Sequence, residues 1–282
     1  MGVHLGCGSW TDDEYVGVLY AKGLAKTSRL SVYAEWFDRV EVNSFYHAIP
    51  KREYVQRWVD QTPAKFRFDI KLPKEFSENP AGAARDETVA RFLHAVQPVL
   101  AANKLGVYLL TMPPSFGPPK RSLTELDGLI EKLRPHVLAV ELRHRGWLEG
   151  SERATTLDYF HAQQLVWVSV DVAPVDSPRI LPLLDVASNP QHAYLRLHGR
   201  NPAYGTAGST EAGHYHDYTP DELGEIAARI KTLAAKAKNV HVTCNNHVEN
   251  FAPKAAIALK RLLGQPTLSG PPEPPSEQTE LF

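Results

Sequence analysis

The sequence is short of three features that would assign it to a special class of protein. Its 282 residues include only two cysteines, Cys7 and Cys244. Two are too few for a disulfide scaffold, so we expect a cytoplasmic protein. The 31 basic and 32 acidic residues give a net charge of −1, which argues against a broadly basic nucleic-acid surface. No stretch approaches about 20 consecutive apolar residues and the first residues carry no signal-peptide pattern, so we expect neither a membrane span nor a secretory leader.

The sequence also lacks the motifs that mark common catalytic and cofactor sites. It has no phosphate-binding G-x-x-x-x-G-K-[ST] loop, no G-x-G-x-x-G after a strand, no G-x-S-x-G elbow and no H-E-x-x-H helix. His214 and His216 have H-x-H spacing, but they follow a glycine-rich stretch. We therefore interpret them as part of a loop rather than a metal centre, and the sequence assigns no metal or cofactor.

Alternating polarity is the strongest pattern that the sequence contains. A β-strand turns successive side chains to opposite faces, so alternation gives it one apolar and one polar face. Charged groups are costly to bury alone, and we expect those of the polar faces to converge on one site. The pattern occurs in five stretches, residues 39–43, 139–143, 167–171, 194–198 and 241–245.

Eight predicted strands, most of them separated by predicted helices, indicate the fold. Strands that alternate with helices pair in parallel through right-handed crossovers, and eight such units predict a single-domain α/β protein, a (β/α)₈ TIM-like barrel. An open doubly wound sheet is the alternative, but its central strands should be apolar on both faces. The predicted strands are 3–8, 40–43, 66–71, 105–111, 137–143, 166–171, 193–198 and 240–245. The predicted helices are 28–38, 52–61, 84–103, 124–133, 154–164, 220–238 and 255–263.

The end of the chain differs in composition from the rest. We expect a barrel domain over residues 1–265 and a disordered tail over 266–282, because residues 270–277 are dominated by proline. Gln278, Leu281 and Phe282 form a Q-x-x-L-F ending, which resembles the peptide by which bacterial replication and repair proteins dock on the DNA sliding clamp. The resemblance implies the clamp as a partner.

Several motifs, in order along the chain, are similar to those of one family. The chain resembles the DUF72 (YecE-like) family over about residues 3–263, which implies a TIM-barrel fold and no established activity. The motifs are Gly8-Ser9-Trp10, residues 40–46, Trp58 with Thr62-Pro63, Met112-Pro113-Pro114, Glu141-Leu142-Arg143 with Trp147, residues 194–199 and Asn245-Asn246.

The C-terminal ends of the predicted strands supply the candidate site, because that end of a TIM barrel holds the active site. Glu41 and Glu141 are candidates for an acid/base pair, with His198 to move a proton near neutral pH and Asp171 as a further catalytic carboxylate. The substrate-binding candidates are of three kinds: cationic side chains that would bind an anionic group, amides that would orient the substrate and aromatic rings that would stack on it. They are Lys71, Arg143, Arg196, Asn43, Asn245, Asn246, Trp10, Tyr46 and Trp147.

Three functional hypotheses follow from these residues. The first is an enzyme of hydrolase or lyase type that acts on a phosphorylated or nucleic-acid-derived substrate and is recruited to the sliding clamp by the tail. The second is a carbohydrate-processing enzyme, for which the two carboxyl groups should lie about 5 to 9.5 Å apart and free of arginine pairs. The third is a non-catalytic ligand-binding or adaptor barrel.

Overall fold

A computed structural model describes residues 2–82, 85–204, 210–246 and 248–271. All eight predicted strands are present, and every recorded pairing between them is parallel. The order in the sheet is β1-β8-β7-β6-β5-β4-β3-β2, so the sheet curls into a nearly closed barrel. The strands are β1 (Gly2–Cys7), β2 (Arg39–Val42), β3 (Arg67–Lys71), β4 (Leu105–Thr111), β5 (Leu138–Glu141), β6 (Val166–Val172), β7 (His192–Gly199) and β8 (Asn239–Cys244).

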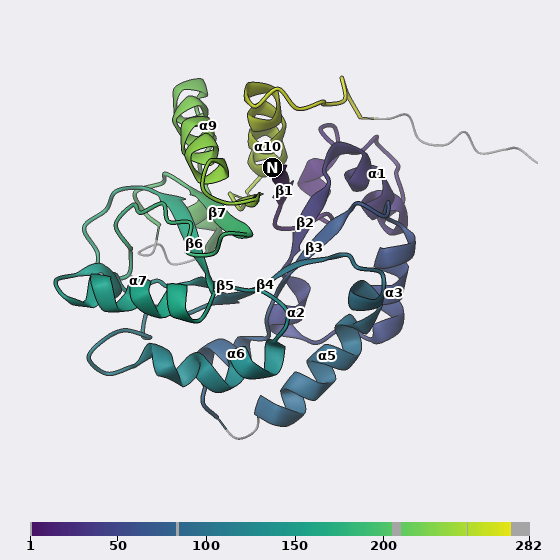
Figure 1. Ribbon diagram of the computed structural model, residues 1–282. Coiled ribbons are helices and arrows are strands. Elements are labelled where there is room, and N and C mark those ends of the chain that lie inside the picture. Colours follow the sequence, from purple (N-terminus) through teal and green to yellow (C-terminus); the bar gives the residue numbers. More distant parts are fainter. Residues whose placement is uncertain (1, 83–84, 205–209, 247, 272–282) are drawn as a thin grey trace, which may run out of the picture.

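A ring of helices surrounds the strands, as Figure 1 shows. The helix α9 begins as the sequence predicts, with Thr219 and Glu222 in a capping box and Pro220 in the first turn. None of the helices in the described ranges is long and apolar enough to cross a membrane. The larger helices are α1 (Arg29–Trp36), α3 (Arg52–Asp60), α5 (Arg85–Ala101), α6 (Asp127–Leu133), α7 (Glu152–Ala162), α9 (Pro220–Ala234) and α10 (Phe251–Leu262). Short helices are α2 (Ser44–His47), α4 (Lys74–Glu78) and α8 (Thr210–His214), with 3₁₀ turns at Asp13–Tyr15, Lys26–Ser28, Leu123–Leu126 and Arg145–Leu148.

The barrel has a seam between β1 and β2, the two ends of the sheet order. Tyr33 of α1 bridges the seam: its hydroxyl accepts from the Cys7 backbone N–H at 2.7 Å and donates to the Arg39 carbonyl at 3.2 Å. Gly6 permits this close approach, because a Cβ there would lie 2.3 Å from the Arg39 carbonyl oxygen. Side chains therefore connect β1 to β2 where the backbone ladder is interrupted.

The main core lies between the strands and the helices, and both cysteines belong to it. Cys7 and Cys244 are opposite each other on β1 and β8 and are fully buried. Both side chains therefore pack between the strands and the helices. Burial raises the pKa of the Cys7 thiol to about 12, so this thiol stays protonated at neutral pH.

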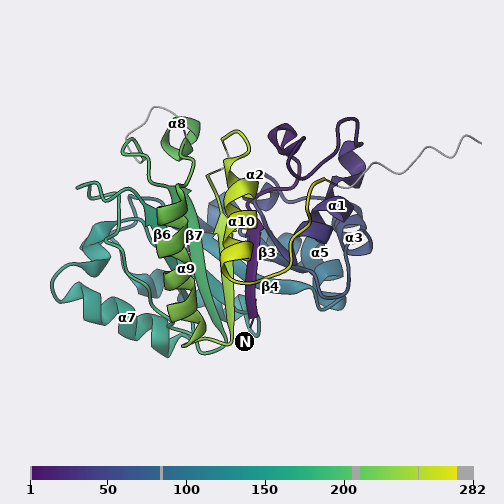
Figure 2. The ribbon, with the colours of Figure 1, turned by 90° about the horizontal axis from the view of Figure 1, so that it is seen from above.

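The alternation of β6 corrects one sequence-based expectation. Val166 and Val168 belong to a small apolar cluster with Val107, Leu109, Ala139 and Tyr194, on the inner face of the barrel. Trp167 points the other way and packs on Phe160 of α7 at a ring distance of 5.1 Å. The polar side chains of β6 thus face the helices, whereas the alternating polar side chains of β2, β5, β7 and β8 face the barrel axis. Figure 2 shows the barrel from the side, with α2 and α8 at the end where the strands terminate.

Candidate functional site

A column of charged side chains fills the barrel on the side of β2, β3 and β7. Arg39 of β2 forms an ion pair with Asp69 of β3 and donates to the Val242 carbonyl of β8 at 2.5 Å. Above this pair, the Tyr194 hydroxyl donates to Glu41 at 2.9 Å. These groups are at most 1% exposed, so each charge depends on its partner rather than on water.

Arg196 of β7 sits between the two carboxylates that were predicted as an acid/base pair. Its Nε and Nη2 contact the Glu41 carboxylate at 2.9 and 2.7 Å, and its Nη1 pairs with Glu141 Oε2. The other Glu141 oxygen accepts from Arg143 Nε at 2.7 Å. Arg196 therefore directs all three of its nitrogens to the two carboxylates, which counts against its prediction as a substrate contact.

The environment of Glu41 and Glu141 keeps both ionised. Burial alone would raise the pKa of each carboxyl group, but the positive charges of Arg196 and its neighbours outweigh burial and hold both pKa values below the ordinary range. A carboxylate held this way is a poor proton donor at neutral pH and a weak base. The geometry therefore counts against the predicted acid/base pair.

Lys71 of β3 is the cation of this cluster that lacks a carboxylate. Within the described ranges, no acidic oxygen lies within 4.0 Å of its Nζ, which instead stands 4.0 Å from the centre of the Tyr46 ring. Its side chain is partly exposed. Burial and the charges of Arg196 and Arg143 lower the pKa of Lys71 to about 7. The site thus contains an amine that is substantially neutral at physiological pH.

His198 is placed at the mouth as predicted, but its charge state is not the predicted one. The ring is fully buried, stacks on Tyr204 with centroids 5.3 Å apart, and has Nδ1 3.2 Å from the amide nitrogen of Asn245. Its Nε2 lies 3.4 Å from Glu141 and has no hydrogen-bond partner among the described residues. Burial lowers the pKa of His198 to about 4. This keeps the ring neutral at pH 7 and counts against the predicted role of His198 in moving a proton near neutral pH.

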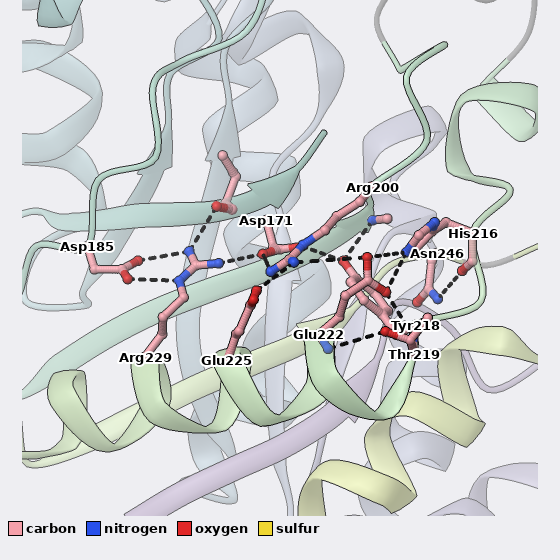
Figure 3. A network of polar contacts seen from close by, with 12 residues as sticks. Asp171, Asp185, Arg200, His216, Tyr218, Thr219, Glu222, Glu225, Arg229 and Asn246 are labelled. Carbon is pink, nitrogen blue, oxygen red and sulfur yellow. Dashed lines mark hydrogen bonds and ion pairs between the residues drawn. The ribbon is translucent and has the colours of Figure 1, made fainter. Parts of the chain in front are cut away.

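Asp171 lies on the other side of the sheet, and its prediction as a mouth residue is wrong. It receives two hydrogen bonds of 3.0 Å from Arg200 and further bonds from Arg229 of α9 at 2.5 Å and Tyr218 at 2.9 Å. Figure 3 shows this network, which connects β6 and β7 to α9. Asn246 belongs to the same region, because its amide donates to the His216 carbonyl at 2.9 Å (Figure 3).

The aromatic candidates divide into one buried ring and two accessible ones. Trp147 is 3% exposed and donates through Nε1 to the Phe116 carbonyl at 2.7 Å, so it caps the core and cannot stack on a ligand. Trp10 is partly exposed, meets Trp58 edge-on at 5.3 Å, and lines a pocket of about 600 Å³. Glu41 and Asn43 line the same pocket, which therefore adjoins the charged column. Tyr46 contributes its ring to Lys71.

The part of the charged column around Asp69 was not predicted from the sequence. Asp69 binds both Arg39 and His241, the latter at 3.0 Å. Residues 66–71 also alternate between apolar and polar side chains, so the same period-2 signal would have found Asp69 on the face that carries Lys71. Nothing in the sequence pattern indicates that Tyr194 would reach Glu41 across the barrel.

The remaining predicted sites can be placed only in part. Across the ranges that the structure describes, no group of three His, Cys, Asp or Glu side chains is arranged to hold a metal ion. His216 instead forms an ion pair with Glu222 at 3.0 Å. Gln278, Leu281 and Phe282 of the predicted clamp-binding tail lie outside the described residues.

Comparison with known proteins gives a family without a described reaction. Residues 4–279 match the family described as "Protein of unknown function DUF72". The UPF0759 protein YunF of Bacillus subtilis is 24% identical over 258 residues, which cover 87% of this chain and 89% of that protein. The UPF0759 protein YecE of Escherichia coli K12 is 33% identical over 179 residues, 63% of this chain and 62% of that protein.

Solved structures agree with the fold. A DUF72 family protein from Enterococcus faecalis V583 superposes with a TM-score of 0.85 at 24% identity and covers 96% of this chain and 99% of its own. Another, from Thermotoga maritima MSB8, gives a TM-score of 0.81 at 24% identity, with 94% and 100% covered. At this identity the likeness shows the barrel and says nothing about its ligand.

Proposed function

The chain belongs to the DUF72 family, and since that family has no described activity, we propose a function from the chemistry of this chain's own barrel mouth. The mouth binds a phosphate-bearing small molecule, of phosphorylated or nucleic-acid-derived type, and the protein acts on it as an enzyme. The observation that carries this proposal is the excess of positive charge at the mouth. The guanidinium groups of Arg143 and Arg196, together with the protonated share of Lys71, outweigh the two carboxylates of Glu41 and Glu141.

The excess charge is available to a ligand because of how the ion pairs are divided. Arg196 takes both carboxylates, while Arg143 uses only its Nε and is 33% exposed. The two Nη groups of Arg143 donate to no residue within the described ranges. A planar guanidinium edge binds phosphate oxygens bidentately, and the Lys71 amine, when protonated, adds a point charge. Together they form a cradle for one dianion.

The pocket beside Trp10 gives the ligand a second point of attachment. Its volume of about 600 Å³ falls within the range typical of small-molecule sites. Trp10 and Trp58 provide ring faces and edges, and Asn43 has a buried Oδ1 without a hydrogen-bond partner among the described residues. A sugar or base could stack there while its phosphate lies near Arg143.

Titration calorimetry with inorganic phosphate and with a nucleoside 5′-monophosphate tests this proposal. We expect both to bind the wild-type protein, and Arg143→Gln to weaken binding at least about tenfold, which corresponds to loss of one charge-assisted contact. Arg153→Gln, at an exposed position on α7, is the matched control and should bind as the wild type does. Absence of phosphate binding, or equal affinities for Arg143→Gln and Arg153→Gln, would refute the proposal.

The carbohydrate hypothesis is not supported by this geometry, because Glu41 and Glu141 are both held by arginine. Neither is free to act as acid or nucleophile.

Recruitment by the tail is a separate part of the proposal and rests on sequence alone. We expect the full chain to bind the bacterial sliding clamp through Gln278, Leu281 and Phe282, and the Leu281→Ala/Phe282→Ala double variant to lose binding in a pulldown. The control is Arg143→Gln, which should leave clamp binding unchanged. If only tail variants change a cellular phenotype, the adaptor hypothesis replaces the enzyme. Wild-type protein that fails to bind the clamp removes the recruitment hypothesis and leaves the phosphate site untouched.

A further inference from the structure

We infer that Lys71 is the amine nucleophile of the mouth and forms an imine with an aldehyde or ketone that carries a phosphate group. The phosphate part of this inference rests on the function proposed above, and the carbonyl part goes beyond it. The proposal names a reactive atom, Nζ of Lys71, and a substrate class, phosphorylated carbonyl compounds.

The arrangement of charges explains why Lys71 has no paired carboxylate in the part of the chain that the structure describes. Glu41 and Glu141 accept five hydrogen bonds, and none of the five comes from Lys71. The donors are Arg143, Tyr194 and Arg196. Lys71 is left beside two arginines and the face of Tyr46. A lysine next to other cations in a partly desolvated site is the arrangement that activates amines for attack on carbonyl groups.

The charge state of the amine favours the same role. With its pKa lowered to about 7, about half of the Lys71 side chains carry a free lone pair at neutral pH. An ordinary lysine with a pKa near 10.4 would be neutral in roughly one molecule in several thousand. A nucleophile needs that lone pair, so the site raises the reactive fraction about a thousandfold.

Two other lysines show what distinguishes Lys71. Lys104 is buried, but its Nζ donates to the Val59 and Thr62 carbonyls, each at 2.7 Å. These hydrogen bonds give Lys104 a structural role. Lys74 is exposed and paired with Glu78 at 2.9 Å, and that pair raises its pKa. Lys71 has neither a carbonyl nor a carboxylate partner among the described residues, is partly exposed, and lies at the end of β3, where substrates enter a barrel of this type.

The reaction is a condensation that needs no external oxidant or reductant. The Nζ lone pair attacks the carbonyl carbon, a C–N bond forms, and the carbonyl π electrons move to the oxygen. Both amine hydrogens leave with that oxygen as water, and the C=N bond completes the imine. The phosphate of the substrate would lie on the free Nη groups of Arg143, so that the cradle holds the carbonyl close to Lys71.

The test is trapping with sodium borohydride, which donates hydride to the imine carbon and converts the imine into a stable secondary amine. The probe is glyceraldehyde 3-phosphate at pH 7, and peptide mass spectrometry locates the adduct. We expect labelling at Lys71, loss of that adduct in Lys71→Arg and Lys71→Met, and unchanged labelling at Lys71 in Lys74→Arg. Glyceraldehyde without phosphate should label at least tenfold more slowly. Wild-type labelling that is no greater at Lys71 than at Lys74 would overturn the inference.

The outcome separates this inference from the proposed function. Phosphate binding by calorimetry without borohydride trapping overturns the imine and leaves the phosphate site standing. Equal trapping of glyceraldehyde and its phosphate supports the nucleophile but contradicts the phosphate part of its substrate class. Lys71→Arg keeps a positive charge, so retained phosphate binding in that variant shows that it is folded and that its lost adduct reports chemistry.

Discussion

At the scale of single residues, Lys71 should lower the free energy of unfolding. The unfolded chain binds the lysine proton with a pKa near 10.5, whereas the folded protein binds it with a pKa of about 7. The unfolded state therefore holds more protons between these values, and folding is disfavoured most when the pH is at or below 7. Sites that activate a residue by desolvation commonly lower stability in this way.

We therefore expect Lys71→Met to raise the melting temperature at pH 7 by roughly 3 to 6 °C, for a gain of about 1 to 2 kcal/mol after allowance for partial exposure. Differential scanning calorimetry at pH 7 measures it. Lys74→Met, on a solvated side chain, is the control and should leave the melting temperature nearly unchanged. A lower melting temperature for Lys71→Met would show that the amine is a structural group.

Arg196 and Arg143 should differ sharply when each is replaced by methionine. Arg196 is 1% exposed and contacts both Glu41 and Glu141, so Arg196→Met leaves two carboxylates buried with fewer partners. Removing one member of a buried pair costs about 3 to 5 kcal/mol. Arg143 is partly exposed and Glu141 keeps Arg196 as a partner, so Arg143→Met should cost less, about 1 to 2 kcal/mol. Urea unfolding separates the two cases, and equal losses would contradict the division between a structural and a ligand-binding arginine.

At the scale of elements, the Tyr33 hydroxyl group contributes two hydrogen bonds to the seam between β1 and β2. Tyr33→Phe removes the acceptor of the Cys7 N–H and the donor to the Arg39 carbonyl, leaving a buried N–H without a partner. We expect a loss of about 1 to 3 kcal/mol in the free energy of unfolding.

Tyr108→Phe is a matched control for the seam, because the Tyr108 hydroxyl is equally buried and has no hydrogen-bond partner among the described residues. Its removal should be neutral or slightly stabilising. The free energies of unfolding of both variants can be measured in urea. If the two substitutions cost the same, the hydroxyl bridge does not hold the seam.

The elements show what the sequence could and could not predict. Period-2 alternation marked five of the eight strands, because alternation depends on local spacing alone, and the other three were predicted as strand-like runs. It could not say which face of a strand points inward. In β6 the inward face is apolar, and Asp171 is drawn outward by Arg229 and Arg200, which come from elsewhere in the sequence. Local spacing carries no information about such partners.

The candidate site illustrates the same limit. Its charged residue types could be predicted at the strand ends, but their roles depend on which cation takes which carboxylate. Arg196 reaches Glu41 and Glu141 together only because β2, β5 and β7 face one another across the barrel. Because arginines pair with both glutamates, Glu41 and Glu141 act as counterions rather than as an acid and a base. Lys71 remains as the proposed reactive group.

At the scale of the whole molecule, the interior of the barrel makes stability depend on pH. His198 and His192 both have pKa values lowered to about 4, chiefly by burial, whereas an unfolded histidine titrates near 6.5. Between pH 6.5 and 4 the unfolded chain binds more protons, so stability falls as the pH falls through this window. His4 acts in the opposite direction, because its hydrogen bond to Asp38 raises its pKa.

The carboxylates contribute at lower pH than the histidines do. The pKa values of Glu41 and Glu141 are held below their ordinary range, so the stability that they contribute is present above their unfolded pKa, near 4.3. It is lost as the pH falls through their lower folded values. The loss between pH 7 and 5 therefore reports mainly on the buried histidines, with smaller shares from His136, whose pKa burial also lowers, and from Lys71, whose folded pKa is about 7.

We expect the free energy of unfolding to decrease between pH 7 and 5 by about 1 to 2 kcal/mol for each of His192 and His198, less the opposing share of His4. The double variant His192→Asn/His198→Asn removes both titrations and should flatten this dependence, even if it lowers stability at every pH. His47→Asn, at an exposed position on α2, should keep the wild-type slope. Urea unfolding at half-unit pH steps gives the three slopes. An equal slope in the double variant and the wild type would mean that the barrel interior takes up protons at some other group, and would remove the neutral His198 from the description of the mouth.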